Sequence, residues 1–488
     1  MVYILFPKLF LSLQSQTIKT IKVMYEIKGK YTDDVKVFAE NVEESALAQV
    51  QEIADCPANK GKKVRIMPDC HTGVNICIGA SVPVDVNNPN ERICPGHVGV
   101  DIGCTVSMTL YDKPVPEENI PMLEHRLKKL LPFGMNINEG VSYDKKELKQ
   151  WLNKYMDRLV SAHPVFADYA VRFNDDRDIS DWLGKLGMND KLFYKSLPSI
   201  GGGNHFVEYS VDEKTGHYGM LAHCGSRNLG KKVYEYWAEV ASGKKFPKEV
   251  RKAIVEEVKR NNTDRRKLDA EIQAAKDKWM EGKIPGYLGG EDMLRYLVDV
   301  CIAQAYASYN HELIHRVMAK VYGELSEGKP IEYIRTTHNY SDYDFEALDG
   351  LPHMMVRKGA IRSYSGEKMI IPFNMRDGIS VCVGKSNPDW NFTAPHGAGR
   401  LMSRKVAFDT LDVEEFKKQM SDAGIYTTTA DKNTLDEAPG AYKPKEDIVR
   451  LIEPTAEILY FMKPKMNIKS AENFGGWRKK KEDKGDPR

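Results

Sequence analysis

Cysteine is scarce in this sequence, and its positions follow no regular spacing. Among 488 residues there are 8 cysteines, at positions 56, 70, 77, 94, 104, 224, 301 and 382. A secreted domain built on disulfides has denser and more regular cysteines, so this class is excluded. We expect a reducing, cytoplasmic location.

A strong charge of either sign is also missing. The 71 basic and 69 acidic side chains leave a net charge of +2, so any binding of nucleic acid depends on local basic patches. No internal repeat or low-complexity linker divides the chain. A hydrophobic content of 42% and a charged content of 29% are typical of a soluble protein with a large core.

The first residues lack the features of a targeting segment. Residues 1–13 are apolar, but no basic region precedes them, Lys8 interrupts them and no small-residue cleavage site follows. This segment is too short to span a membrane. We interpret residues 1–23 as a dispensable extension before a more natural start at Met24, and residues 471–488 as a charged, disordered tail.

Periodicity and punctuation predict a mixture of helices and strands. Helices are expected at 43–55, over much of 117–190, from about Lys231 and at 291–322. β-rich stretches are expected at 64–86, 206–209, 219–230 and 331–383. Residues 246–283 carry two apolar stripes at helical spacing, which predict a helical hairpin inserted into the main domain.

One glycine-rich stretch stands out as the centre of a functional site. Gly201, Gly202 and Gly203 precede Asn204 and His205, and a strand-like alternation follows. Three residues without Cβ let the backbone approach a bulky anion closely. A metal-and-phosphate site fits this pattern, and a tight hairpin with a hydrogen-bonded histidine fits it equally well.

Asp101 and Cys104 are the first candidate metal ligands. They lie three residues apart across a glycine, so both side chains can turn toward one point. His205, His223 and His338 end β-like segments beside small or polar residues, where a strand directs its side chain into a shared cleft. Two divalent cations on these ligands would leave a surplus of positive charge, which suits a triphosphate or an RNA phosphate.

His396 differs from the other histidines because it has glycines at 397 and 399 and no carboxylate nearby in the sequence. A histidine without a metal can attack phosphorus and hold a phosphoryl group as a phosphoramidate. A histidine in an ordinary turn is the alternative. Cations in the glycine-rich segments match phosphate geometry, and these are Arg227, Lys358, Arg400 and Arg404.

Residues 311–315, HELIH, match the HExxH pattern of zinc proteases. A string this short arises by chance in about two chains in a hundred. Helical geometry places His311 opposite the apolar face of Tyr309 and Leu313, which predicts a solvent-exposed histidine. We therefore do not favour a protease.

Taken together, the motifs resemble those of the RtcB family of RNA ligases. The motifs are PDCH, HVGVDIGC, GGGNHFVE, HCGSR, THNY, RKGA, PHGAGRLMSR and DEAPGAYK, in the family's order from about Met67 to Lys469. The resemblance implies an enzyme that joins RNA 3′-phosphate or 2′,3′-cyclic phosphate ends to 5′-hydroxyl ends, using GTP and two manganese ions. It also implies an archease-like helper protein as a partner.

The resemblance assigns roles to individual positions. Asp101, Cys104 and His205 would hold one manganese ion, and Cys104, His223 and His338 the other. The nucleophile that accepts GMP would be His396. The positions that would bind GTP are Asn204, Glu208, Ser380, Ala398, Gly399, Tyr442 and Lys469. The positions that would hold RNA phosphates are Arg227, Lys358, Arg400 and Arg404.

The expected fold is α+β, with packed β-sheets around one deep cleft and helices outside. Because the motifs span some 400 residues and converge on one site, residues 24–470 are expected to form a single catalytic domain. Two other functions use parts of the same pattern. A dinuclear phosphohydrolase would need the metal ligands but no nucleotide adduct, and a non-catalytic RNA-binding scaffold would need only the basic patches.

Overall fold

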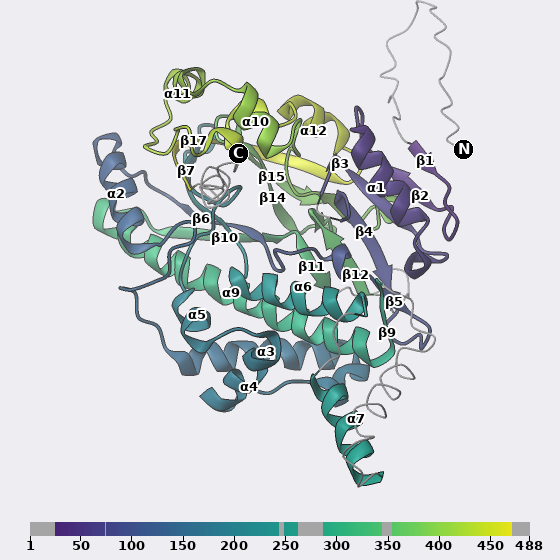
Figure 1. Ribbon diagram of the computed structural model, residues 1–488. Coiled ribbons are helices and arrows are strands. Elements are labelled where there is room, and N and C mark those ends of the chain that lie inside the picture. The colour runs from purple at the N-terminus through teal and green to yellow at the C-terminus, as the bar shows by residue number, and fades with distance from the viewer. Residues whose placement is uncertain (1–24, 74, 244–247, 262–285, 344–353, 471–488) are drawn as a thin grey trace, which may run out of the picture.

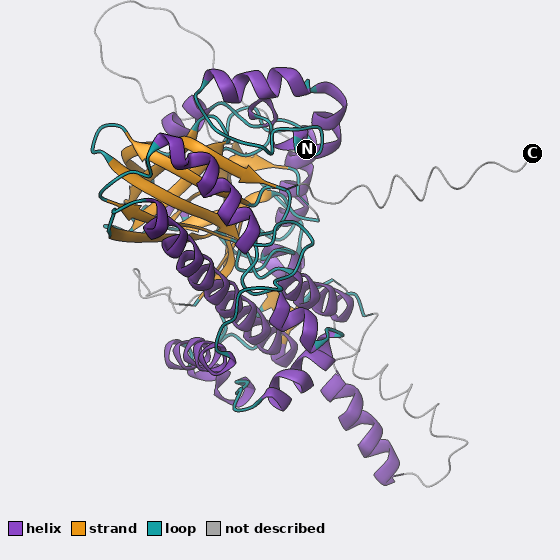
Figure 2. Cartoon of the chain, turned by 90° about the vertical axis from the view of Figure 1, so that its left-hand side faces the viewer, coloured by secondary structure: helices purple, strands orange, loops and turns teal. Residues whose placement is uncertain are grey.

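The structure, a computed structural model, describes residues 25–73, 75–243, 248–261, 286–343 and 354–470. These residues form an α+β fold with two large β-sheets and helices packed outside them (Figures 1 and 2). The α+β class expected from the sequence is confirmed. Among the described helices, none combines the length and apolarity required to cross a membrane.

The first large sheet has six strands. Their order is β1 (Tyr25–Ile27), β2 (Val35–Val37), β3 (Val64–His71), β4 (Ile78–Val84), β12 (Met354–Lys358) and β11 (Asn339–Asp342). The pair β2–β3 is parallel and the other pairs are antiparallel. Helix α1 (Glu44–Ala54) packs its buried Val50 and Ile53 in the same core as β2, β3 and β4.

The second large sheet has seven strands and is antiparallel throughout. Their order is β10 (Pro330–Thr337), β6 (Thr105–Tyr111), β8 (His217–Cys224), β7 (Phe206–Asp212), β17 (Ala456–Lys469), β15 (Gly378–Gly384) and β14 (Lys368–Asn374). The sheet curls until its two edges meet, and the backbone N–H of Ile370 in β14 donates to Oγ1 of Thr336 in β10 at 2.9 Å. Two short pairs complete the strands, β5 (Arg92–Ile93) with β9 (Leu288–Gly289) and β13 (Ala360–Arg362) with β16 (Thr393–Pro395).

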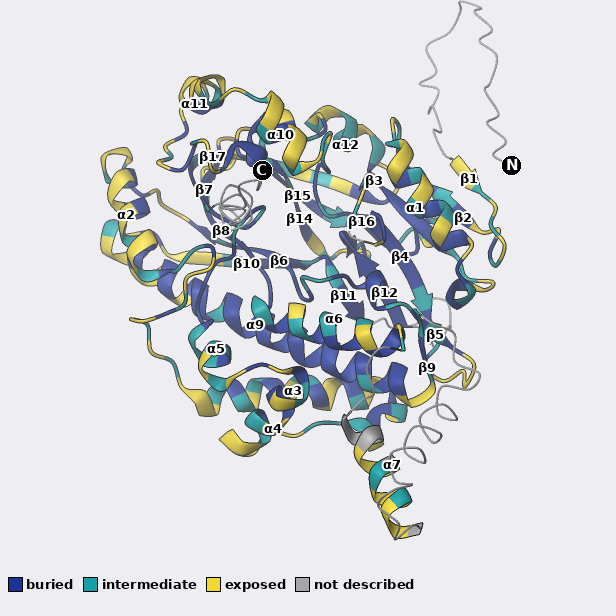
Figure 3. Ribbon diagram, in the orientation of Figure 1, coloured by how far each residue is buried: buried dark blue, intermediate teal, exposed yellow. Residues whose placement is uncertain are grey.

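Helix α9 (Gly290–Leu325) is the longest described helix and runs beneath both sheets (Figure 1). It is buried along almost its whole length, whereas the outer helices expose one side (Figure 3). The other helices are α2 (Ile120–Leu130), α3 (Lys145–Ala162), α4 (Asp176–Leu186), α5 (Asp190–Lys195), α6 (Asn228–Ala241), α7 (Lys248–Asn261), α10 (Arg404–Thr410), α11 (Val413–Asp422) and α12 (Lys445–Leu451).

Most helices lie where the sequence predicts them. Residues 43–55 correspond to α1 and residues 291–322 to α9. The helix expected from about Lys231 begins earlier, at Asn228, because Arg227 makes the turn after β8 with a φ of 58°. Of the predicted hairpin, Lys248–Asn261 is helical, and the second half lies outside the described residues, as do the extension 1–23 and the tail 471–488.

Candidate metal and nucleotide site

Four predicted metal ligands lie at the ends of neighbouring strands. Cys104 precedes β6, His205 precedes β7, His338 follows β10 and His223 is next to last in β8. These strands are antiparallel neighbours in the seven-stranded sheet, so the start of one strand lies beside the end of the next. The sheet therefore brings together residues that are far apart in the sequence.

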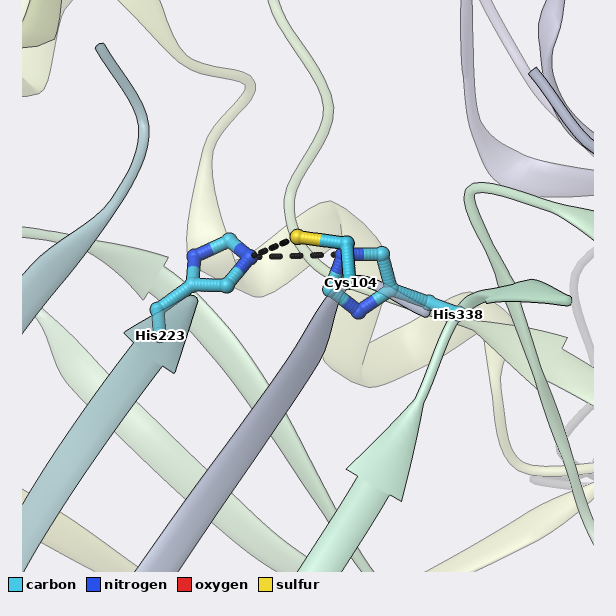
Figure 4. A group of neighbouring side chains, drawn as sticks. All are labelled: Cys104, His223 and His338. Carbon is cyan, nitrogen blue, oxygen red and sulfur yellow. Dashed lines mark hydrogen bonds between the residues drawn. The ribbon is translucent and has the colours of Figure 1, made fainter. Parts of the chain in front are cut away.

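The donor atoms of these residues form two overlapping groups. Sγ of Cys104 lies 3.2 Å from Nε2 of His205 and 3.2 Å from Nε2 of His223. On one side, Nε2 of His205 lies 2.8 Å from Oδ2 of Asp101. On the other side, Nε2 of His223 lies 3.3 Å from Nε2 of His338 (Figure 4). The donor atoms within each group lie within 4.8 Å of one another, and Cys104 belongs to both groups.

Burial controls the protonation of these ligands. It lowers the pKa of His223 and His338 well below the usual value, so both imidazoles are neutral and offer a lone pair. Burial raises the pKa of the Cys104 thiol, whose proton a cation would displace on binding. Burial also opposes ionisation of Asp101, but the charge and hydrogen bond of His205 hold the pKa of that carboxyl below its usual value. This donor set fits a divalent transition metal.

His396 has an acidic partner, Asp69, from a distant part of the chain. Nδ1 of His396 lies 2.5 Å from Oδ2 of Asp69, which also accepts the backbone N–H of His396 at 3.0 Å and of Gly397 at 3.3 Å. No carboxylate lies near His396 in the sequence, but the fold brings Asp69 to it from 327 residues away, so the histidine is not without a carboxylate partner. Since a carboxylate accepts, Nδ1 carries the hydrogen, and in the neutral ring the lone pair is on Nε2.

A cavity of about 640 Å³ lies between the two large sheets and contains most of the predicted site. His71 and Ile78 line it from the six-stranded sheet, whereas Glu208 and Lys469 line it from the seven-stranded sheet. The predicted site residues that line the cavity are Asn204, Glu208, His223, His338, His396, Ala398, Gly399, Arg400, Arg404, Tyr442 and Lys469.

Glu437 forms ion pairs with three cations that line this cavity, and the sequence analysis does not single it out. Its carboxylate lies 2.9 Å from Nζ of Lys469, 2.6 Å from Nη1 of Arg404 and 3.3 Å from Nη1 of Arg400, and it accepts from the hydroxyl of Tyr442. Burial alone would raise the pKa of Glu437, but the charges of the three cations hold it well below its usual range. The guanidinium of Arg400 lies over the phenol ring of Tyr442, with Cζ 5.2 Å from the centroid of the ring.

Apart from the candidate metal ligands Asp101, Cys104 and His205, three predicted site residues do not line the cavity. Ser380 is fully buried in β15. The ammonium of Lys358 donates to the backbone carbonyl of Ile76 at 2.7 Å, and burial lowers the pKa of Lys358 to about 8. Arg227 donates to a backbone carbonyl and to the hydroxyl of Ser199. The structure therefore separates these residues from the ones that share the cavity.

The HExxH histidines form a buried hydrogen-bonded chain instead of facing solvent. Nε2 of His311 donates to the carbonyl of Cys224 at 3.0 Å, so its Nδ1 accepts from the hydroxyl of Ser107 at 2.6 Å. Ser107 in turn accepts from His315 at 2.8 Å, and His315 accepts from Thr109 at 2.8 Å. The predicted exposure of His311 is wrong, because β6 and β8 cover the side of α9 that the helical pattern left polar.

Comparison with known proteins agrees with the motif-based resemblance. A family model described as tRNA-splicing ligase RtcB matches residues 49–470. RNA-splicing ligase RtcB1 from one strain of Escherichia coli is 26% identical over 428 residues, which cover 84% of this chain and 90% of that protein. RNA-splicing ligase RtcB of strain K12 is 26% identical over 427 residues, with the same shares covered.

A more distant relative extends the comparison to a eukaryote. RNA-splicing ligase RtcB homolog 2 of Entamoeba dispar is 23% identical over 453 residues, which cover 83% of this chain and 80% of that protein. The matched residues include all five predicted metal ligands and His396. This chain belongs to the RtcB family.

Proposed function

We propose that this chain is an RNA ligase that joins an RNA 3′-phosphate or 2′,3′-cyclic phosphate end to a 5′-hydroxyl end, using GTP and two manganese ions. The observation that carries the proposal is the position of His396. Its ring centroid lies 4.9 Å from that of His338, so the proposed nucleophile adjoins one candidate metal ligand, and both line the same cavity. Membership of the RtcB family, with relatives named RNA-splicing ligases, supports the same reaction.

In this proposal each of the two donor groups binds one metal ion. Asp101, Cys104 and His205 would hold one manganese ion, and Cys104, His223 and His338 the other. When bound, the ions would neutralise phosphate charge and align the reacting groups. The chain itself supplies buried neutral imidazoles and a thiol that can ionise when a cation binds.

Asp69 and His396 would carry out the first step. Asp69 holds Nδ1–H of His396, which orients Nε2 and stabilises the positive charge that the ring acquires in the attack. Nε2 forms a bond to the α-phosphorus of GTP, and the bond to pyrophosphate breaks with its electron pair. The guanylyl group then passes to the RNA 3′-phosphate, after hydrolysis of a cyclic end, and the 5′-hydroxyl finally displaces GMP.

The cavity wall of the seven-stranded sheet would bind the nucleotide. Glu208 would accept hydrogen bonds from guanine, Tyr442 would stack on the base and Lys469 would complete the pocket. Asn204 would contact the triphosphate, and Arg400 and Arg404, which line the same cavity, would hold RNA phosphate. Residues 24–470 would act as one catalytic domain.

One experiment separates this function from its alternatives. The protein is incubated with manganese and GTP labelled on the α-phosphate, and then run on a denaturing gel. A ligase of this type retains the label on the protein, and passes it to RNA with a 3′-phosphate. A dinuclear phosphohydrolase or an RNA-binding scaffold leaves the protein unlabelled, which would contradict the proposal.

Replacing Asp69 with asparagine is expected to slow guanylylation by about 10²- to 10⁴-fold. The amide keeps the shape of the side chain but removes the charge that stabilises the attacking imidazole. Adduct formation is measured in a single turnover, with manganese content as a check on the metal ligands. The matched control is D33N, an exposed carboxylate between β1 and β2, which should keep the wild-type rate. Equal rates for D69N and D33N would rule out this role.

The binding of GTP is expected to strengthen as pH rises through about 7. Burial raises the pKa of Glu208 to about 7, so its carboxyl is protonated at lower pH. A protonated carboxyl cannot accept hydrogen bonds from two N–H groups of guanine at once, because one of its oxygens carries a hydrogen. Between about pH 6 and 8 the apparent KM for GTP should fall about tenfold. The E208Q variant should bind more weakly and lose this dependence. An identical pH dependence in both proteins would exclude Glu208 as its source.

A further inference from the structure

His71 lines the same cavity, and none of the steps above uses it. It is the last residue of β3, two residues after Asp69, and its side chain is partly exposed and lines the cavity. It lies on the wall of the six-stranded sheet, whereas Glu208 and Lys469 lie on the wall of the seven-stranded sheet. A strand of RNA that enters the cavity between the sheets would therefore pass this imidazole.

One hydrogen bond fixes the tautomer of His71. Its Nδ1 lies 2.9 Å from the backbone carbonyl oxygen of Asp69. A carbonyl only accepts, so Nδ1 carries the hydrogen and Nε2 carries the lone pair. Asp69 thus holds two imidazoles in the same state, His396 through its carboxylate and His71 through its carbonyl.

A glycine lets the backbone close against this carbonyl. Gly399 has a φ of 74°, and a Cβ there would lie 2.2 Å from the carbonyl oxygen of Asp69. From the other side, Nζ of Lys443 donates to the carbonyls of Pro68 at 3.2 Å and Cys70 at 2.7 Å. The backbone that holds His71 is therefore packed tightly on both sides.

The surroundings keep His71 neutral. Burial lowers the pKa of His71 to about 4, and the charges of His396 and Lys443 act in the same direction. The hydrogen bond to Asp69 and the charge of Asp69 oppose this shift. Glu43 also lines the cavity and accepts from the hydroxyl of Thr72 at 2.8 Å. Nε2 of His71 is consequently free of a proton at neutral pH.

The proposed reaction needs such a base at its joining step. Nε2 of His396 has no proton to lose when it attacks GTP, and an RNA 3′-phosphate is already ionised when it attacks the histidine adduct. The 5′-hydroxyl, by contrast, must lose its proton as it attacks. None of the roles assigned above includes accepting this proton.

We propose that His71 is the general base of the joining step, a role that rests on the function proposed above. The 5′-oxygen forms a bond to the phosphorus of the activated 3′-phosphate, and the bond from this phosphorus to GMP breaks. GMP leaves with the electron pair, and the hydroxyl proton moves to Nε2 of His71. His71 then loses this proton to water.

The test uses RNA that already carries the 3′-guanylyl group, so that joining is measured alone. In H71N the amide can still donate to the Asp69 carbonyl, but the lone pair of Nε2 is lost. Joining in a single turnover should be about 10²- to 10⁴-fold slower, while guanylylation with GTP stays within about twofold of wild type. The wild-type joining rate should be flat above about pH 5, and the H71N rate should rise with pH.

Two controls separate a base from a structural residue. H125N changes an exposed histidine of α2 and should keep both rates. H71A should regain joining when imidazole is added. An equal loss of joining and guanylylation in H71N would mean that His71 only supports Asp69 and would overturn the proposal, as would unchanged joining. A wild-type protein that forms no adduct would contradict the proposed function itself.

Discussion

Replacing His396 with alanine is expected to abolish the covalent attachment of GMP to the protein. Alanine offers no nitrogen in place of Nε2. Asp69 keeps only the hydrogen bonds from the backbone N–H groups of residues 396 and 397, and it is not expected to replace the imidazole as nucleophile. Loss of a nucleophile typically reduces the reaction by about 10⁴-fold or more. The measurement is the label that remains on the protein after denaturing electrophoresis, and the wild-type label should be lost in acid because it is a phosphoramidate.

The interpretation of this variant depends on intact metal binding. His396 belongs to neither donor group, so H396A should bind as much manganese as the wild type. H125A, on the exposed side of α2, should form the adduct at the normal rate. Labelling of H396A at the wild-type level would show that another residue accepts GMP.

The residues that form the two donor groups could be selected from the sequence because their signals are local. His205, His223 and His338 each lie at the end of a strand-like segment, and Cys104 lies just before one. The antiparallel order β10–β6–β8–β7 then places these ends side by side. The strand ends were predictable from each segment, but the order of the strands was not.

The carboxylates of the site show why the rest could not be predicted. Asp69 contacts His396 across 327 residues, and Glu437 contacts Lys469 from a short turn with no helical or strand periodicity. Each is an acid inside a motif, but its partner depends on how the two sheets pack. A search for carboxylates to balance Arg400, Arg404 and Lys469 would have been the available signal.

His311 shows the opposite error, in which a local rule is applied without the tertiary context. Its position on the polar side of α9 predicts exposure only for a helix at the surface. Sheet strands and helices cover α9 on nearly all sides, and the polar side chains there satisfy one another. Helical periodicity therefore identified the helix and misplaced the histidine.

Cys104→Ser is expected to remove activity and to reduce manganese binding at both positions. Sγ of Cys104 is the atom common to the two donor groups, 3.2 Å from Nε2 of both His205 and His223. A serine hydroxyl ionises far less readily than a thiol and is a weak ligand in its neutral form. Guanylylation should fall by at least about 10²-fold.

The control for this variant is Cys56→Ser, which changes a buried thiol outside both donor groups and should keep nearly full activity and metal content. Metal content after gel filtration and the melting temperature with manganese are measured for both proteins. Thiolate and imidazole also bind zinc tightly, so excess zinc should inhibit the wild type by displacing manganese. If C104S and C56S retained the same metal content and the same activity, Cys104 would not bridge two ions, and the dinuclear arrangement would have to be abandoned.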